Sequence, residues 1–119
     1  MANDTVQDGQ ALIFPTVDFN IGTAYDSQTG VFTTPTDGTY LFTARLCTND
    51  KDVINYAIVV DGSDVTHGVH FGNTHDCASF NVMAILKAGN EVWVTCFFPG
   101  NKIAADEYRW NTFAGVVLY

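Results

Sequence analysis

The sequence predicts an all-β domain, and three observations support this prediction. Apolar and polar residues alternate with a period of two in several short stretches. No segment keeps the 3.6-residue period of an amphipathic helix. Glycine and proline recur at short intervals between the alternating stretches. Many short strands separated by such turn residues are typical of a β-sandwich or barrel.

The first half of the chain contains the clearest strand. A short apolar stretch, 12–14, ends at Pro15, and an alternating stretch, 17–19, follows it. Residues 39–46 then alternate without interruption, and one face of this strand carries Tyr40, Phe42, Ala44 and Leu46. We expect this face to lie in the core.

The second half repeats the pattern. Residues 56–60 alternate and are followed by Asp61 and Gly62, a dipeptide typical of a hairpin turn. Residues 80–86 form a further strand, 87–90 turn the chain, and 92–97 alternate again. The final stretch, 112–119, is apolar almost throughout, which predicts a strand covered on both sides.

Size and charge limit the class of partner. The chain has 119 residues, 47% of them hydrophobic, which is enough for one domain with a core. Thirteen acidic residues against five Lys and Arg give a net charge of −8. Such a surface repels nucleic acids and anionic lipids. No apolar run approaches the roughly 20 residues of a membrane helix, so we expect no membrane insertion.

Three cysteines leave the redox state open. Cys47, Cys77 and Cys96 cannot all pair within one chain. One disulfide plus one thiol, three buried thiols, or an interchain bond are the alternatives. The positions favour buried thiols, because lone cysteines in strands usually serve as small hydrophobic side chains.

The sequence contains no recognisable catalytic motif. None of its three serines (Ser27, Ser63, Ser79) lies in a Gly-x-Ser-x-Gly turn. A glycine-rich phosphate loop and a motif pairing cysteine with histidine are also missing. We therefore expect a binding protein and not an enzyme.

A set of aromatic, Asn and Gly residues at fixed spacing resembles a known family signature. The set consists of Phe14, Asn20, Tyr25, Phe32, Gly38, Tyr40 and Phe42. It resembles the signature of the complement C1q globular head domain, over about residues 10–119. The family signature has a further aromatic where this chain has Ala44. We expect a neighbouring side chain to fill that space, and we expect Phe32, Tyr40, Phe42 and Phe113 to be core residues. Gly38 is expected in a turn, with a positive φ.

The resemblance implies a fold, an assembly and a function. The fold is a ten-strand jelly-roll β-sandwich shared with tumour necrosis factor ligands. Residues 1–9 would be an N-terminal tail or a partial first strand, so the fold is one strand short if that strand is missing. The resemblance also implies a secreted homotrimer. Stalkless members of the family are lectin-like proteins of innate immunity, which predicts binding of glycans or microbial surface molecules. The alternatives are a ligand or matrix protein that engages a protein receptor, and a metal-binding extracellular protein.

One predicted metal site follows from the resemblance. Acidic loops of calcium-binding members hold the ion, and the corresponding stretch here is 72–76, with Asn73, His75 and Asp76. Calcium usually takes six to eight oxygen ligands, so symmetry copies, carbonyls and water would complete the shell. The other interpretation is a solvated loop. His67, His70 and His75 lie within nine residues and are either transition-metal ligands or solvated loop residues.

The predicted ligand site is the segment before the final strand. Tyr108, Arg109 and Trp110 place an aromatic ring beside a guanidinium, which suits a sugar with a carboxylate. Alternatively, Trp110 packs under this loop or against the next subunit. Asp61 and Asp64 resemble half of a calcium loop, but a hairpin turn explains them.

Overall fold

The computed structural model describes residues 2–5, 10–14, 24–48, 53–71, 77–105 and 111–119. Those residues form strands and turns only, so they contain no helix that could cross a membrane. The strands are β1 (Ala2–Thr5), β2 (Tyr25–Asp26), β3 (Val31–Thr33), β4 (Gly38–Cys47), β5 (Val53–Val60), β6 (Ser63–Phe71), β7 (Cys77–Leu86), β8 (Glu91–Ala105) and β9 (Thr112–Val117).

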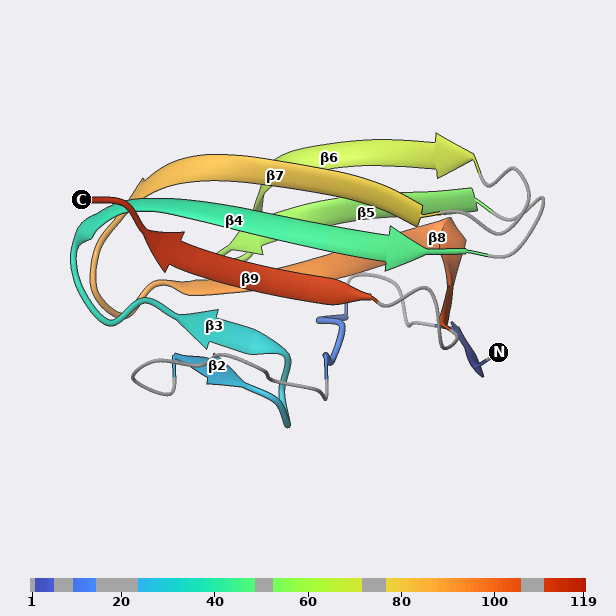
Figure 1. The fold of residues 1–119 in the computed structure, drawn as a ribbon, viewed down its shortest axis with the longest axis horizontal. Coiled ribbons are helices and arrows are strands. Elements are labelled where there is room, and N and C mark those ends of the chain that lie inside the picture. The colour runs from blue at the N-terminus through green and yellow to red at the C-terminus, as the bar shows by residue number, and fades with distance from the viewer. Residues whose placement is uncertain (1, 6–9, 15–23, 49–52, 72–76, 106–110) are drawn as a thin grey trace.

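The strands form two antiparallel sheets that pack face to face (Figure 1). One sheet has the order β2-β3-β8-β5-β6, with β1 paired to the far end of β8. The other has the order β7-β4-β9. Strands that are distant in sequence are neighbours in both sheets. The prediction of an all-β sandwich is therefore confirmed, and its layout is that of a jelly roll.

Strand β4 forms one wall of the core as predicted. Tyr40, Phe42, Ala44 and Leu46 are at most 3% exposed. Buried residues of the opposite sheet face them, among them Ile54, Ile58, Val92, Val94 and Cys96. The side-chain period of two along β4 places every second residue on this wall.

The signature aromatics meet in one cluster. Phe42 lies at its centre, with ring centroids 5.3 Å from Phe32, 5.9 Å from Tyr40 and 6.1 Å from Phe113. The ring of Phe113 also contacts Phe14 and Tyr25, at 5.8 and 5.9 Å. Full burial of such a side chain contributes about 1.5–3 kcal/mol. The spacing of these residues is thus explained by packing, as expected.

Neighbouring rings flank the small side chain of Ala44. Its cross-strand partners are Phe80 on β7 and Phe113 on β9, so both rings lie on the same face of the sheet. Phe80 in turn stacks on Tyr56 of the opposite sheet, with ring centroids 3.9 Å apart. Ala44 is 3% exposed, so the missing aromatic leaves no open surface.

The hairpin turn at Asp61 and Gly62 is confirmed. Both residues have positive φ, 49° and 90°, as a type I′ turn requires. The Asp61 carboxylate accepts hydrogen bonds from the Glu91 backbone N at 2.9 Å and from Asn90 Nδ2 at 2.7 Å. Both of its oxygens are therefore engaged within the fold, and the turn explains this segment without a calcium ion.

Gly38 has a different role from the one predicted. It begins β4, and its φ is not among the positive values of the described residues. A Cβ atom at this position would lie 2.9 Å from the Tyr119 carbonyl oxygen and 3.0 Å from Val117 Cγ2. Glycine is thus needed here because the C-terminal residues pack closely against it.

The prediction that 112–119 is covered on both sides is wrong for the single chain. Among the described strands, β9 pairs with β4 alone and forms the edge of its sheet. Val116, Val117 and Leu118 are 43–52% exposed, and Tyr119 is 83% exposed. The apolar run therefore contributes to an exposed face instead of a second core.

The N-terminal stretches differ from regular strands. Leu12 and Phe14 are buried, and the segment joins β8 through an isolated bridge between Ala11 and Thr95 and a hydrogen bond from Leu12 N to Val94 O at 2.8 Å. Residues 17–19 lie outside the described part of the chain. Ala2–Thr5 form the short strand β1, so the domain boundary at residue 10 stays a prediction.

Candidate functional site

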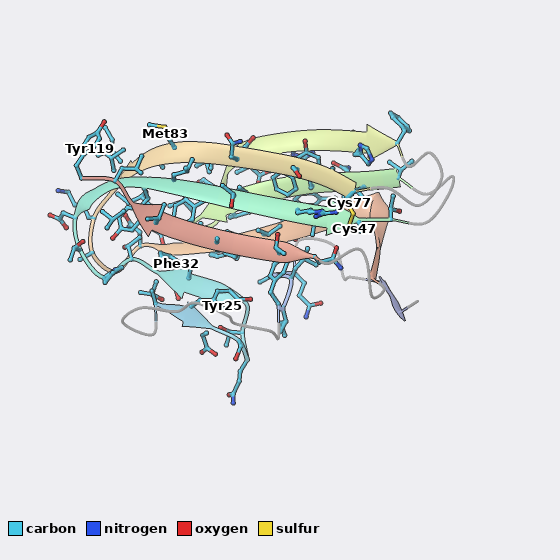
Figure 2. The ribbon with its side chains drawn as sticks, viewed as in Figure 1. Tyr25, Phe32, Cys47, Cys77, Met83 and Tyr119 are labelled. Carbon is cyan, nitrogen blue, oxygen red and sulfur yellow. A yellow bond between two sulfur atoms is a disulfide. The ribbon has the colours of Figure 1, made fainter. Side chains whose placement is uncertain are left out.

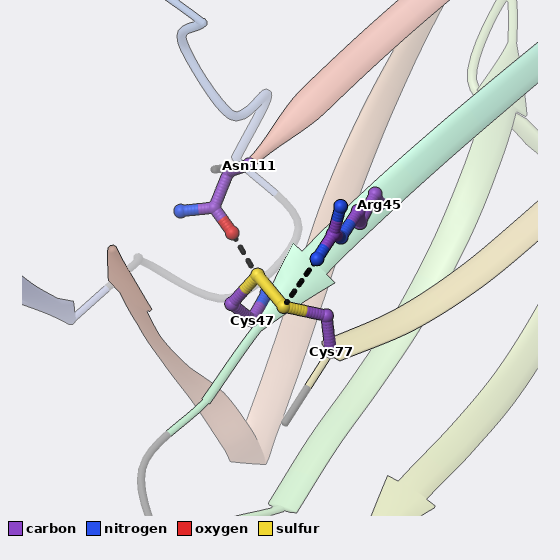
Figure 3. Close-up of a disulfide and its surroundings, with 4 residues drawn as sticks. All are labelled: Arg45, Cys47, Cys77 and Asn111. Carbon is purple, nitrogen blue, oxygen red and sulfur yellow. Dashed lines mark hydrogen bonds between the residues drawn. A yellow bond between two sulfur atoms is a disulfide. The ribbon is translucent and has the colours of Figure 1, made fainter. Parts of the chain in front are cut away.

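A disulfide joins the end of β4 to the start of β7 (Figure 3). Cys47 and Cys77 lie directly opposite each other in the register of the two strands. The prediction of three buried thiols is wrong for this pair and correct for Cys96, which is free and buried. Pairing depends on the register of two strands 30 residues apart, which the cysteine spacing alone does not give.

Asn111 ties a third segment to the same point (Figure 3). The backbone N of Cys47 donates a hydrogen bond to Asn111 Oδ1 at 2.7 Å. Asn111 immediately precedes β9. The end of β4 and the starts of β7 and β9 are therefore linked by one covalent bond and one hydrogen bond. We call Cys47, Cys77 and Asn111 the disulfide junction.

The disulfide junction adjoins both predicted site segments. Asn73, His75 and Asp76 belong to the segment that ends at Cys77, and Tyr108, Arg109 and Trp110 to the segment that ends at Asn111. These six residues lie outside the described part of the chain. The structure shows that Cys77 and Asn111, the residues that follow these segments in the sequence, are both joined to Cys47, the first by the disulfide and the second by the hydrogen bond. Binding segments are commonly carried by such a rigid framework.

Arg45 is a polar residue at this end that the sequence did not single out. It is exposed, and its Nη2 atom donates to Cys77 Sγ at 3.5 Å. Its cross-strand partners are Ser79 on β7 and Thr112 on β9, both exposed. No carboxylate forms an ion pair with Arg45 within the described residues. Sequence alternation placed Arg45 on the outward face of its strand but gave no sign of its neighbours.

Two of the three predicted histidines, His67 and His70, lie in the described part of the chain, whereas His75 lies outside it. His67 and His70 lie on β6, not in a loop, and their spacing of three puts them on opposite faces of the strand. His67 contacts Asn55 Oδ1 through Nε2 at 2.6 Å and stacks on Phe97. Nowhere in the described ranges do three or more His, Cys, Asp or Glu side chains lie close enough to hold a metal ion.

The outer face of the β7-β4-β9 sheet has two chemically different halves. Near the disulfide, the outward residues are exposed and, apart from Ala114, polar: Thr43, Arg45, Ser79, Asn81 and Thr112. Toward the other end they are apolar apart from Thr39: Leu41, Met83, Ile85, Val116 and Leu118. Figure 2 shows Met83 and Tyr119 at one end of this sheet and the two cysteines at the other. We call the apolar set the apolar patch.

Comparison with known proteins assigns the family. The family model described as the C1q domain matches residues 1–118. The chain belongs to the C1q domain family. The expectation drawn from the signature residues is thereby confirmed.

Curated relatives share this domain but are longer. The chain is 28% identical over 111 residues to complement C1q tumor necrosis factor-related protein 3 of Mus musculus, covering 91% of this chain and 44% of that protein. It is 31% identical over 109 residues to complement C1q and tumor necrosis factor-related protein 9A of Homo sapiens, covering 89% of this chain and 32% of that protein. The chain thus spans less than half the length of these two relatives.

A solved structure supports the fold. The globular domain of zebrafish complement 1qA protein superposes with a TM-score of 0.77 at 17% sequence identity. The superposition covers 100% of this chain and 92% of that one. At this identity the likeness shows the C1q fold.

Proposed function

We propose that this chain is a secreted, lectin-like C1q protein that binds glycans or other microbial surface molecules as a homotrimer in innate immunity. The observation that carries the proposal is the disulfide junction. It gives the residues that follow the two predicted binding segments, 72–76 and 108–110, a common rigid base. Secretion is supported by the disulfide itself, because such bonds persist mainly in oxidising compartments.

The apolar patch supports the homotrimer. Ile85 is 86% exposed, Met83 57% and Val116 52% in the single chain. Contiguous exposed apolar side chains of this kind mark interaction sites in soluble proteins. A second copy of the chain is a natural partner, because most soluble oligomers are symmetric assemblies of one chain. Three copies would also raise weak single-site affinity through multivalency.

A binding role agrees with the chemistry of the described residues. Cys96 is the free thiol among them, and burial raises its pKa to about 12, so it is not a ready nucleophile. Arg45, Ser79 and Thr112 offer donors and acceptors on an open face instead of an enclosed reaction site. We therefore propose recognition without catalysis.

The test is a binding screen of the folded protein on glycans and on microbial surfaces, with calcium and with a chelator. We expect binding, and we expect Trp110→Ala to weaken it. If 72–76 holds calcium, the chelator and the substitution Asp76→Asn should each reduce binding. If 72–76 is a solvated loop, neither should change it. A folded trimer that ignores every glycan and microbial surface would exclude the proposed function.

One observation favours the alternative of a protein receptor. Val65, Val69 and Phe71 on β6 are 41, 52 and 72% exposed and lie at the edge of the other sheet. An apolar strip of this kind suits a protein surface better than a sugar. If glycan binding is absent, β6 is the surface on which to test a purified receptor, with Phe71→Ser as the variant.

A further inference from the structure

The outer face formed by β8, β5 and β6 carries large side chains above small ones. Ile58 in β5 lies in the core, so its neighbours Ala57 and Val59 face outward. Both are nevertheless at most 4% exposed. Trp93 lies directly across from Val59, and His67 directly across from Ala57, which puts these larger side chains on the same outer face. The larger side chains therefore cover the strand between them.

His67 is an exposed side chain that its neighbours hold in one orientation. Its ring stacks on Phe97, with ring centroids 5.5 Å apart and an interplanar angle of 6°. Its Nε2 atom lies 2.6 Å from Asn55 Oδ1, and its Nδ1 atom lies 3.4 Å from Asp64 Oδ2. The side chain of His67 is still 47% exposed. Groups that are fixed before a ligand arrives lose less conformational entropy on binding, so this arrangement favours recognition.

Trp93 extends this aromatic surface along β8. It is half-buried and lies four residues from Phe97, or about 13 Å at the rise of an antiparallel strand. Trp93 on β8 and Asp64 on β6 both lie across from Val59 of β5. A carboxylate is therefore in the same row as the indole ring and beside the imidazole ring. We call the following set the ring platform: Asn55, Asp64, His67, Trp93 and Phe97.

We infer that the ring platform binds an uncharged oligosaccharide. The face of an aromatic ring carries partial negative charge, which attracts the C–H groups on the apolar face of a pyranose ring. Asn55 and Asp64 supply the amide and carboxylate groups that hydrogen-bond to sugar hydroxyls. The separation of Trp93 and Phe97 suits several linked sugars, because one pyranose ring covers one aromatic ring. This inference rests on the proposed glycan function, and it adds the class of sugar and the surface that binds it.

The charge of this face favours a neutral sugar over an acidic one. The Asp64 side chain is 42% exposed, and Glu91, two residues from Trp93 on the same face of β8, is exposed as well. An acidic sugar would be repelled by these carboxylates, whereas a neutral sugar would not. The competing ligand is a cationic peptide, which rings and carboxylates also attract. The sugar is favoured because Asp64 already lies beside His67 and because Asn55 contributes an uncharged amide.

The ring platform is separate from the apolar patch. The two sheets pack face to face, so their outer faces point in opposite directions (Figure 1). The apolar patch lies on the outer face of the β7-β4-β9 sheet, and the ring platform lies on the outer face of the other sheet. A trimer assembled through the patch would thus carry one platform on each subunit, and multivalency would strengthen weak sugar contacts.

The experiment titrates mannotriose, chitotriose and lactose, each in its neutral form and in a form with one C6 alcohol oxidised to a carboxylate. Calorimetry measures the affinities of the wild type, Trp93→Ala, Trp93→Phe, His67→Ala and Asp64→Asn, with a chelator present so that calcium makes no contribution. The matched control is Tyr119→Ala, which removes an 83% exposed aromatic side chain at the end of the other sheet. Circular dichroism and light scattering establish that each variant is folded and assembles as the wild type does.

We expect the wild type to bind at least one neutral sugar, and to bind it more tightly than its oxidised form. Trp93→Ala should lower that affinity about tenfold through loss of an aromatic contact, and Trp93→Phe should fall between because it keeps a smaller ring. His67→Ala should also weaken binding, and it provides the test at a more exposed position if Trp93→Ala does not fold. Asp64→Asn should narrow the difference between the neutral and oxidised forms. Tyr119→Ala should match the wild type.

Other outcomes overturn the inference. Tighter binding of the oxidised forms, or unchanged affinity in both Trp93→Ala and His67→Ala, would do so while leaving glycan recognition intact. An equal loss in Tyr119→Ala would show that exposed aromatic side chains contribute without forming a site. Binding of a lysine-rich peptide in place of the sugars, weakened by salt and by Asp64→Asn, would assign the platform to a cationic protein. Absence of binding to these sugars and in the wider screen would reject the proposed function as well.

Discussion

Asn111 holds the start of β9 against the end of β4 through its side-chain Oδ1, which accepts a 2.7 Å hydrogen bond from the backbone N of Cys47. Cys47 is fully buried, so this N–H group has no access to water. Asn111 follows one predicted binding segment in the sequence, and Cys77 follows the other. The hydrogen bond therefore connects the residue after the first segment to the disulfide at the end of the second.

Replacing Asn111 by Ala should therefore affect both stability and binding. A buried donor left without its acceptor costs about 1–3 kcal/mol. We expect the free energy of unfolding to fall by that amount, with weaker glycan binding, as measured by urea denaturation and the binding screen. Asn81→Ala, on the exposed face of β7, is the control. Equal stability of the two variants would show that the hydrogen bond does not support the junction.

The disulfide should make a larger contribution. Cys47 and Cys77 close a loop with a sequence separation of 30, for which the chain-entropy model gives about 3–4 kcal/mol. We expect the double variant Cys47→Ala and Cys77→Ala to lose stability on this scale in urea denaturation. Thiol titration of the denatured, unreduced protein should detect one thiol and, after reduction, three. Three thiols before reduction would contradict the pairing.

Gly115 should tolerate no side chain. A Cβ atom there would lie 2.6 Å from Phe42 Cε1 and 2.8 Å from Phe42 Cδ1, in the centre of the aromatic cluster. Overpacking of this kind costs about 1–3 kcal/mol, so Gly115→Ala should lower the denaturation midpoint. The exposed neighbour Ala114 offers the control Ala114→Ser, for which we expect little change. A Gly115→Ala protein as stable as the wild type would show that the rings move aside.

The apolar patch should control assembly. Ile85→Glu places a charge at the most exposed residue of the patch, so we expect this variant to be a folded monomer in place of the proposed trimer. Light scattering after size exclusion measures the mass. The matched control Val65→Glu carries the same charge on the other sheet, where it should leave the trimer intact. An intact Ile85→Glu trimer would place the interface elsewhere.

Alkaline pH should destabilise the protein through Cys96. Burial raises the pKa of this thiol from 9.0 to about 12. Between these values the unfolded chain has lost the proton that the folded chain keeps, so stability falls as pH rises from about 9 to 12. The denaturation midpoint should fall between pH 8 and pH 10.5, and it should fall less in Cys96→Val than in the wild type. If Cys96→Val loses as much stability at high pH as the wild type does, groups other than this thiol cause the loss.

The sequence by itself determined the all-β class, the family and the core face of β4. Side-chain alternation is a local property of a strand, so Tyr40, Phe42, Ala44 and Leu46 were assigned to the core without knowledge of their partners. The spacing of the signature residues likewise identified the family, which the comparison confirmed. The candidate site segments came from residue chemistry and the resemblance alone, and they remain predictions.

The tertiary structure decided everything that depends on which strands are neighbours. Cys47 meets Cys77, and Arg45 lies between Ser79 and Thr112, because β4 is central between β7 and β9 in one particular register. The same order leaves β9 at an edge, so the apolar run 112–119 is exposed in the single chain. Such contacts join residues tens of positions apart, and strand alternation carries no information about them.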